Sequence, residues 1–127
     1  MNSFKKTERI KEHGLIEELL KFKNSFKSGS FIISYINRDK KTSKNKILIS
    51  IPKKNIKNAV DRNRIKRLIR ESYRLQKHII SEIISHNKTL AILLVYNSNK
   101  TNVTFKEIFD KIKLILQSLK KTQNEKN

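Results

Sequence analysis

The spacing of apolar and polar positions along the chain predicts a short series of helices and strands. Residues 13–27 carry leucine and isoleucine at helical spacing with charged side chains opposite, which predicts an amphipathic helix. A Ser-Gly-Ser sequence at 28–30 is typical of a break after that helix. The polar residues ahead of it, about 1–8, are expected to form a flexible arm.

Strands are predicted on both sides of the chain's middle. Residues 31–36 are rich in β-forming side chains, and residues 47–51 alternate isoleucine with other residues as a half-buried strand does. Pro52 ends the second strand because proline has no N–H for the ladder. Residues 89–96 are apolar at nearly every position, as in a strand buried on both faces. The polar stretch 37–46 is predicted as a loop or hairpin tip, and a third short strand within it stays open.

A long helix is predicted from about Ala59 to at least Lys77, with Ile84 as its furthest end. Asn58 is placed to cap this helix, and Asp61 supplies an acidic side chain in its first turn. The capping residues therefore define where the helix begins, and its end is placed between Lys77 and Ile84.

A last helix is predicted to begin at the capping box of Thr104 and Glu107 and to run to about Lys120. A polar tail of about 121–127 follows it. Periodicity alone thus gives the order α-β-β-α-β-α. No repeat or linker interrupts the chain, so residues 1–127 are predicted to form one domain.

The charge of the chain is strongly unbalanced. It carries 30 lysine and arginine residues against 11 acidic ones over 127 residues, for a formal net charge of +19. An excess of this size favours a polyanionic partner. Five of the seven arginines lie within residues 62–74, and a guanidinium group grips phosphate with two hydrogen bonds at once.

A helical wheel of residues 62–80 separates two faces. The core face is predicted to hold Ile65, Leu68, Ile69, Leu75, Gln76 and Ile79. The basic face is predicted to hold Arg62, Asn63, Lys66, Arg67, Arg70, Arg74 and Lys77, with Arg64 and Glu71 between the two faces. A solvated charged face is the alternative, but such faces normally mix signs so that i,i+4 pairs form. Like charges repel along this helix, which favours a surface that meets phosphates.

Several function classes lack the residues they need. The chain has no cysteine, which excludes disulfides, thiolate zinc sites and cysteine nucleophiles, and its 2 glycines form no phosphate-binding loop. The 3 histidines show no metal-binding spacing, and acids are too sparse for the metal cluster of an autonomous nuclease. No apolar run is long enough to cross a membrane and no signal peptide is visible, so a cytoplasmic protein without a membrane partner is expected.

Three aromatic residues have two open roles each. Phe31 and Tyr35 share one face of a predicted strand, where they would pack in the core or stack on the bases of a single strand, and core packing is favoured. Tyr73 borders the basic face on the wheel, either as a stacking platform or as a boundary residue.

The segment 52–74 resembles the signature of the bacterial ribonuclease P protein subunit. In that family a strand ends in a Lys-Lys pair, and an Ala-Val turn then leads into Arg-Asn-Arg-x-Lys-Arg-x-x-Arg-Glu. This chain has Lys53-Lys54, Ala59-Val60 and Arg62-Asn63-Arg64-Ile65-Lys66-Arg67-Leu68-Ile69-Arg70-Glu71 at those places. The flanking helix and strands agree with the family's order, so the resemblance extends over nearly the whole chain.

The resemblance implies a fold and an assembly. The fold would be α+β, an α/β sandwich with a mixed four-stranded sheet and three helices in the order α-β-β-β-α-β-α. It would contain a left-handed βαβ crossover, as in the second domain of ribosomal protein S5. Members assemble with a large catalytic RNA that removes the 5′ leader of precursor tRNA, and the RNA performs the hydrolysis with divalent metal such as Mg²⁺. The polypeptide would hold no catalytic residue and no metal site.

The resemblance also implies roles for particular residues. The RNA-binding set, with Arg74 added from the wheel, is Lys53, Lys54, Arg62, Asn63, Arg64, Lys66, Arg67, Arg70 and Arg74. The candidates for lining a cleft that holds the leader are Ile16 and Leu20 on the first helix and Phe31 or Tyr35 on a strand. Family members often carry aromatics where this chain has Ile16 and Leu20, so stacking with the leader is expected to be weaker or rearranged.

A structural RNA-binding protein of the ribosome, or an assembly protein, is the alternative to the ribonuclease P subunit. Charge, size and the basic helix suit both, and only the Arg-Asn-Arg block separates them. An autonomous nuclease is the third hypothesis, and activity of the purified protein alone would distinguish it.

Overall fold

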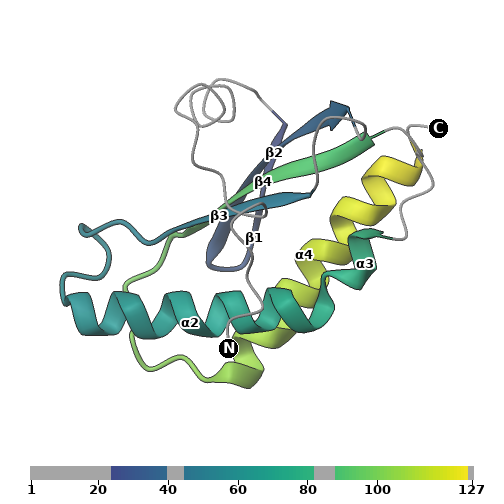
Figure 1. The fold of residues 1–127 in the computed structure, drawn as a ribbon. Helices are drawn as coiled ribbons and strands as arrows, with labels where there is room; N and C mark the ends of the chain where they lie inside the picture. Colours follow the sequence, from purple (N-terminus) through teal and green to yellow (C-terminus); the bar gives the residue numbers. More distant parts are fainter. Residues whose placement is uncertain (1–23, 40–44, 82–87, 126–127) are drawn as a thin grey trace.

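The computed structural model describes residues 24–39, 45–81 and 88–125 (Figure 1). These residues form four strands and three helices. The strands are β1 (Ser25–Ser28), β2 (Phe31–Asp39), β3 (Lys46–Ser50) and β4 (Lys88–Tyr96). The helices are α2 (Ala59–Gln76), α3 (His78–Ser81) and α4 (Phe105–Glu125).

The four strands form one mixed sheet in the order β1-β2-β4-β3. β2 pairs antiparallel with β1 and β4, and β3 pairs parallel with β4. Because α2 connects the two parallel strands, β3, α2 and β4 form a βαβ unit. The predicted α+β class with a four-stranded mixed sheet is therefore confirmed, and the hand of the crossover stays a prediction.

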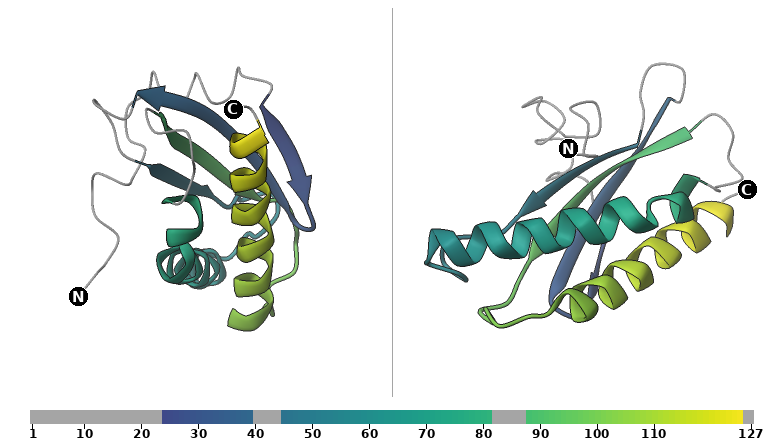
Figure 2. Two further views of the ribbon diagram at one scale, coloured as in Figure 1. Left: turned by 90° about the vertical axis from the view of Figure 1, so that its right-hand side faces the viewer. Right: turned by 60° about the horizontal axis from the view of Figure 1, so that its bottom comes forward.

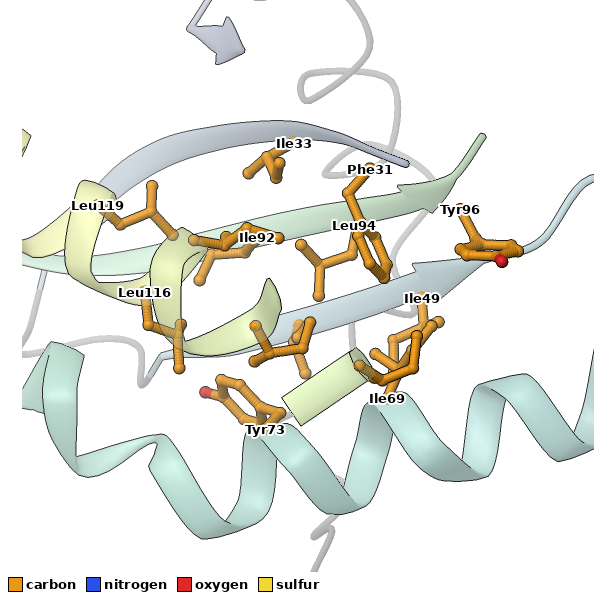
Figure 3. Close-up of a cluster of buried hydrophobic side chains, with 14 of the residues drawn as sticks. Phe31, Ile33, Ile49, Ile69, Tyr73, Ile92, Leu94, Tyr96, Leu116 and Leu119 are labelled. Atoms are coloured by element: carbon orange, nitrogen blue, oxygen red, sulfur yellow. The ribbon is translucent and has the colours of Figure 1, made fainter. Parts of the chain in front are cut away.

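α2 and α4 lie side by side on one face of the sheet (Figure 2). The main core lies between these helices and the sheet. The pleat of the strands decides which residues enter this core. Phe31 and Ile33 on β2 lie opposite Tyr96 and Leu94 on β4, and all four are buried. Figure 3 shows them facing Ile69 and Tyr73 of α2 and Leu116 and Leu119 of α4.

The other face of the sheet has a second, smaller apolar cluster. Ile36, Ala91 and Leu93 are buried there, with Leu48 and Val95 packed against them. β4 is thus buried on both faces, as its nearly unbroken apolar sequence predicts.

The predicted helix over 13–27 is wrong at its C-terminal end. Residues 25–28 form β1, which pairs with β2 in a hairpin that turns at Gly29, whose φ is +58°. Phe26 gains a place opposite Ile33 in this hairpin, and its ring meets Tyr35 edge-on. Tertiary pairing therefore overrides the helical spacing, and the rest of the predicted helix lies outside the described residues.

The additional strand of the sheet is β1, not a segment within 37–46. β2 itself continues to Asp39 and β3 begins at Lys46. The third strand left open in that stretch is therefore wrong for the residues described there, because the polar sequence continues an existing ladder and does not start a new one.

The two long helices begin where the sequence predicts and end differently. α2 ends at Gln76 and is followed, after Lys77, by the short helix α3. α4 continues to Glu125, so the tail predicted over 121–127 is wrong for residues 121–125. Gln123 is buried, which gives the last turn a tertiary contact that its polar sequence does not reveal. The predicted arm of residues 1–8 lies outside the described residues.

Candidate nucleic-acid interface

The connector between β3 and α2 is a tight turn with a buried anchor. The N–H groups of Asn55 and Ile56 donate to the carbonyl of Pro52 at 3.0 and 3.2 Å, and the Ile56 side chain is buried. The Asn55 amide also donates to the carbonyl of Tyr96 at 3.3 Å, at the end of β4. The turn is thereby fixed to the sheet.

The connector presents three lysines to solvent. Lys53, Lys54 and Lys57 are exposed, and their side-chain ammonium groups make no hydrogen bond or ion pair with another described residue. They stand directly before the N-terminus of α2, where Asn58 caps the helix by accepting from the N–H of Val60 at 2.8 Å. The positive end of the helix dipole and these lysines together favour an anion at this end of α2.

The inward face of α2 confirms most of the wheel and corrects it at two residues. Ile65, Ile69 and Gln76 are buried as predicted, and the Gln76 amide donates to the carbonyl of Phe109 on α4 at 3.0 Å. Tyr73 is also buried, at 1% exposed, so it is neither a stacking platform nor a boundary residue. Leu75, predicted to face the core, is 44% exposed.

These two corrections have one cause. The core seen by α2 lies between the sheet and α4, so the buried stripe is turned toward the side of Tyr73 and away from the side of Leu75. A wheel gives the angular spacing of residues but not the position of the neighbouring helix. Around the helix axis, Tyr73 therefore belongs to the buried side, and the basic face lies next to it.

The exposed side of α2 carries residues of the predicted basic face. Asn63 and Arg67 are exposed, and Lys66, Arg70 and Arg74 are half-buried. Asn63, Lys66 and Arg67 make no side-chain hydrogen bond or ion pair with the described part of the chain. These three residues therefore have their donors available for a partner.

One ion pair restrains the C-terminal part of this face. Arg74 donates through Nε to Glu71 at 3.1 Å and also bonds it through a second guanidinium nitrogen. The hydrogen bond from Arg74 lowers the pKa of Glu71, and the same contact raises the pKa of Arg74. The structure thus partly neutralises Arg74, while Lys66 and Arg67 have no acidic partner among the residues that the structure describes.

Two arginines of the predicted RNA-binding set bond the protein's own backbone. Arg62 donates to the carbonyls of Ile56 at 2.9 Å and Lys57 at 2.8 Å, and so fixes the connector to α2. Arg64 donates to the carbonyls of Thr101 at 3.0 Å and Val103 at 2.6 Å. The sequence contains no signal for the Arg64 contacts, because its partners lie 37 and 39 residues away.

Two of the four candidates for the leader cleft, Phe31 and Tyr35, lie among the described residues. Phe31 and Tyr35 are both buried on the face of the sheet that the helices cover, and the ring of Phe31 packs edge-on to Tyr96 with centroids 5.5 Å apart. They are therefore core residues, the alternative that the sequence favoured, and unavailable for stacking with a base. Ile16 and Leu20 lie outside the described residues.

A metal centre was not expected in the polypeptide. Within residues 24–39, 45–81 and 88–125, no group of three or more His, Asp or Glu side chains is placed to hold a metal ion. None of the described helices is long and apolar enough to cross a membrane.

Comparison with known proteins points to a single family. The sequence model described as Ribonuclease P matches residues 4–120. The ribonuclease P protein component of Vibrio campbellii is 34% identical over 92 residues, which cover 72% of this chain and 74% of that protein. The corresponding protein of Porphyromonas gingivalis is 33% identical over 67 residues, 50% of this chain, and the match spans only 49% of that relative's length.

Solved structures agree with this result. A mutant RNase P protein of Staphylococcus aureus, described as defective in mRNA degradation, has a TM-score of 0.72 and 28% identity, covering 91% of this chain and 90% of the other. The RNase P protein of Thermotoga maritima has a TM-score of 0.68 over 87% of this chain and 96% of its own, and at 21% identity it shows the fold alone.

Proposed function

The chain belongs to the ribonuclease P protein family, and from this premise we propose that it is the protein subunit of a ribonucleoprotein endonuclease. In this proposal it binds the catalytic RNA and the 5′ leader of precursor tRNA, and it assists the cut that produces the mature 5′ end. The polypeptide's task is to bind and position RNA, and the phosphodiester hydrolysis belongs to the RNA partner.

The observation that carries the proposal is the basic face of α2. Lys66 and Arg67 have no acidic partner in the described part of the chain, and the exposed lysines 53, 54 and 57 extend the same charge beyond the helix N-terminus. Like charges along a helix cost stability, and phosphates would relieve that cost by replacing repulsion with charge-assisted hydrogen bonds. A surface of this kind binds through released counterions, so its affinity for RNA should fall steeply with salt.

The proposed role of Mg²⁺ concerns the RNA. The described residues offer no set of acidic or histidine ligands that fits a divalent ion, and the proposal assigns the metal to the RNA. When bound to the RNA partner, Mg²⁺ would supply the nucleophile and stabilise charge on the phosphate. A basic protein surface beside that RNA would lower the magnesium needed, because it neutralises some of the same phosphate charge.

The proposal includes binding of the leader, but it does not include stacking of the leader bases on aromatic residues of β2. Because Phe31 and Tyr35 pack in the core, stacking on them is not included. Contact with the leader would rest on charge and hydrogen bonds more than on stacking, which matches the aliphatic residues at positions 16 and 20.

The test is reconstitution of precursor tRNA cleavage at low magnesium. The full chain, a ribonuclease P RNA from the same organism, and the two together are assayed for the cut at the mature 5′ end. We expect cleavage only with both, or strong stimulation of the RNA by the protein. Cleavage by the protein alone would contradict the assignment of the hydrolysis to the RNA. Tight RNA binding without stimulation would favour the structural RNA-binding alternative.

A further inference from the structure

The loop between β4 and α4 is held in one shape by its own hydrogen bonds. The Tyr96 hydroxyl donates to the carbonyl of Lys100 at 2.8 Å, and the N–H of Lys100 donates to the hydroxyl of Ser98 at 3.1 Å. At its start, the N–H of Asn97 donates to the carbonyl of Ser30 at 2.7 Å. Although it contains no helix or strand, the loop is therefore an ordered part of the surface.

Arg64 fixes this loop to α2. Its two terminal guanidinium nitrogens donate to the carbonyls of Thr101 and Val103, and Val103 is anchored in the core. A planar guanidinium fork suits two neighbouring carbonyls, whereas a lysine ammonium would reach one of them. Arg64 stands between Asn63 and Lys66, so the loop is placed directly beside the basic face.

The same loop also adjoins the connector on its other side. The Asn55 amide, which bonds the end of β4, also lies 3.4 Å from the side-chain oxygen of Asn97 and donates to it. The loop is consequently flanked by α2 through Arg64 and by the lysine-bearing connector through Asn55. Both neighbours belong to the basic surface already described.

The outward side chains of the loop are uncharged and available. Asn99, Thr101 and Asn102 are exposed, and their side chains make no hydrogen bond with the described part of the chain. Lys100, the one charged residue among them, is bonded to Glu107 at 2.9 Å. The loop thus offers amides and a hydroxyl beside a surface that offers charge.

Resting on the function proposed above, we propose that residues 99–102 form a second strip of the RNA-binding surface and that Arg64 is its positioning residue. RNA differs from a bare polyanion in its 2′-hydroxyls and base edges, which amide and hydroxyl side chains bind and cationic side chains bind less selectively. The basic face of α2 would hold phosphates, and the loop would bind the sugars or base edges of the same segment.

This inference gives Arg64 a role different from the one implied by the family resemblance. Two of its nitrogens already bond carbonyls, so its main effect on RNA would act through the loop. Arg67 differs, since it is exposed and has no partner within the described residues. Variants at these two arginines should therefore fail in distinguishable ways.

The experiment measures the affinity of the full chain for its ribonuclease P RNA over a range of salt concentrations. The variants are the double Asn99→Ala/Asn102→Ala, Arg64→Lys, their combination, and Arg67→Ala. Lys121→Ala is the matched control, because it removes one exposed charge at the far end of α4. Circular dichroism and thermal unfolding verify that each variant is folded.

We expect the loop double variant to bind about three- to tenfold more weakly with an unchanged salt slope, because only uncharged hydrogen bonds are lost. Arg64→Lys should show the same loss, since it keeps the charge but not the fork, and adding it to the loop variant should have little further effect. Arg67→Ala should instead lower the salt slope by about one and add to the loop variant. Lys121→Ala should bind like the wild type.

Two results would overturn the inference. Wild-type affinity in the loop double variant would remove the loop from the interface. Full additivity between Arg64→Lys and the loop variant would remove Arg64's positioning role. The loop variant decides the first question even if Arg64→Lys fails to fold. Failure of the wild-type chain to bind the RNA would contradict the proposed function itself. Wild-type binding with an unaffected loop variant would contradict only the role of the loop.

Discussion

The two long helices pack on the same face of the sheet (Figure 2), yet charged residues are distributed differently along them. α2 contains five arginines and one lysine against two acids, and Glu71 forms an ion pair with Arg74. α4 contains five lysines and no arginine, and two of its three acids are paired, Glu107 with Lys100 and Asp110 with Lys106. Signs therefore alternate along the start of α4 and stay uniform along much of α2.

The inward faces of the same helices are alike. Each contributes isoleucines that are fully buried, Ile65 and Ile69 on α2 and Ile112 and Ile115 on α4. Packing therefore explains half of each helix equally well and explains nothing about the outward difference. Uniform charge lowers the stability of a helix on its own. The basic face of α2 therefore favours a negatively charged binding partner.

The largest effect is expected where the helices agree. Ile65→Ala and Ile112→Ala should each lower the free energy of unfolding by about 2–5 kcal/mol, because both leave a cavity in the shared core. Urea unfolding measures this, with Leu75→Ala as the control, since that side chain is 44% exposed. Unchanged stability of Ile65→Ala would mean that the inward face of α2 is misassigned.

RNA binding should separate the two helices. Arg67→Ala and Arg70→Ala on α2 should each weaken binding of the ribonuclease P RNA about tenfold, as the loss of a charge-assisted hydrogen bond does. Lys121→Ala on α4 removes the same charge and should have little effect. Filter binding or fluorescence anisotropy at fixed salt gives the ratio, and circular dichroism tests the fold. An unfolded circular dichroism spectrum for both arginine variants would contradict this prediction, because the weaker binding would then come from unfolding.

Substitutions of the N-cap residues should affect the stability of the two helices alike. Asn58→Ala removes the side-chain oxygen that accepts from Val60, and Thr104→Ala removes the hydroxyl that accepts from the N–H of Glu107 at 3.2 Å. Each should lower the free energy of unfolding by about 0.5–2 kcal/mol, because a helix-terminal donor loses its partner. Thermal or urea unfolding of both variants tests this, and RNA affinity corrected for folding should change only slightly. A cap variant that weakened RNA binding as strongly as Arg67→Ala would contradict the separation of stability from binding.

The smallest effect concerns the acid that begins α4. Hydrogen bonds from Lys100 and from the Thr104 N–H and hydroxyl lower the pKa of Glu107 from 4.5 to about 2. A carboxyl whose pKa is lowered by folding stabilises the fold above its unfolded pKa, and this contribution is lost as the pH falls. The stability difference between wild type and Glu107→Gln should therefore be present above pH 4.5 and shrink as the pH falls to about 2. Urea unfolding across that range measures it, and a pH-independent difference would contradict the assigned cause.

The sequence predicts the parts of the fold that depend on local chemistry. The Asn58 cap, the Thr104–Glu107 capping box and the doubly buried strand β4 all lie where the residue pattern places them. What it misses depends on distant partners. β1 forms where the end of a helix is predicted, because Phe26 pairs with Ile33 of β2. α4 extends beyond its predicted end, where Gln123 is buried.

The candidate site shows the same division. The exposed Asn63 and Arg67 agree with the wheel, since they depend only on helical spacing. Tyr73 and Leu75 disagree, because the position of α4 sets the direction of the core. The contacts of Arg64 with Thr101 and Val103 join segments that local sequence does not connect.

The most direct test of the account asks which helix touches the RNA. The chain has no cysteine, so Asn63→Cys on α2 and Ser118→Cys on α4 each provide one site for a photoactivated cross-linker, and both positions are exposed. Each labelled protein is bound to the ribonuclease P RNA and irradiated, and the cross-linked fraction is measured. We expect efficient cross-linking from position 63 and little from position 118. Equal cross-linking from both, or cross-linking from position 118 alone, would contradict the claim that the basic face of α2 is the RNA-binding surface.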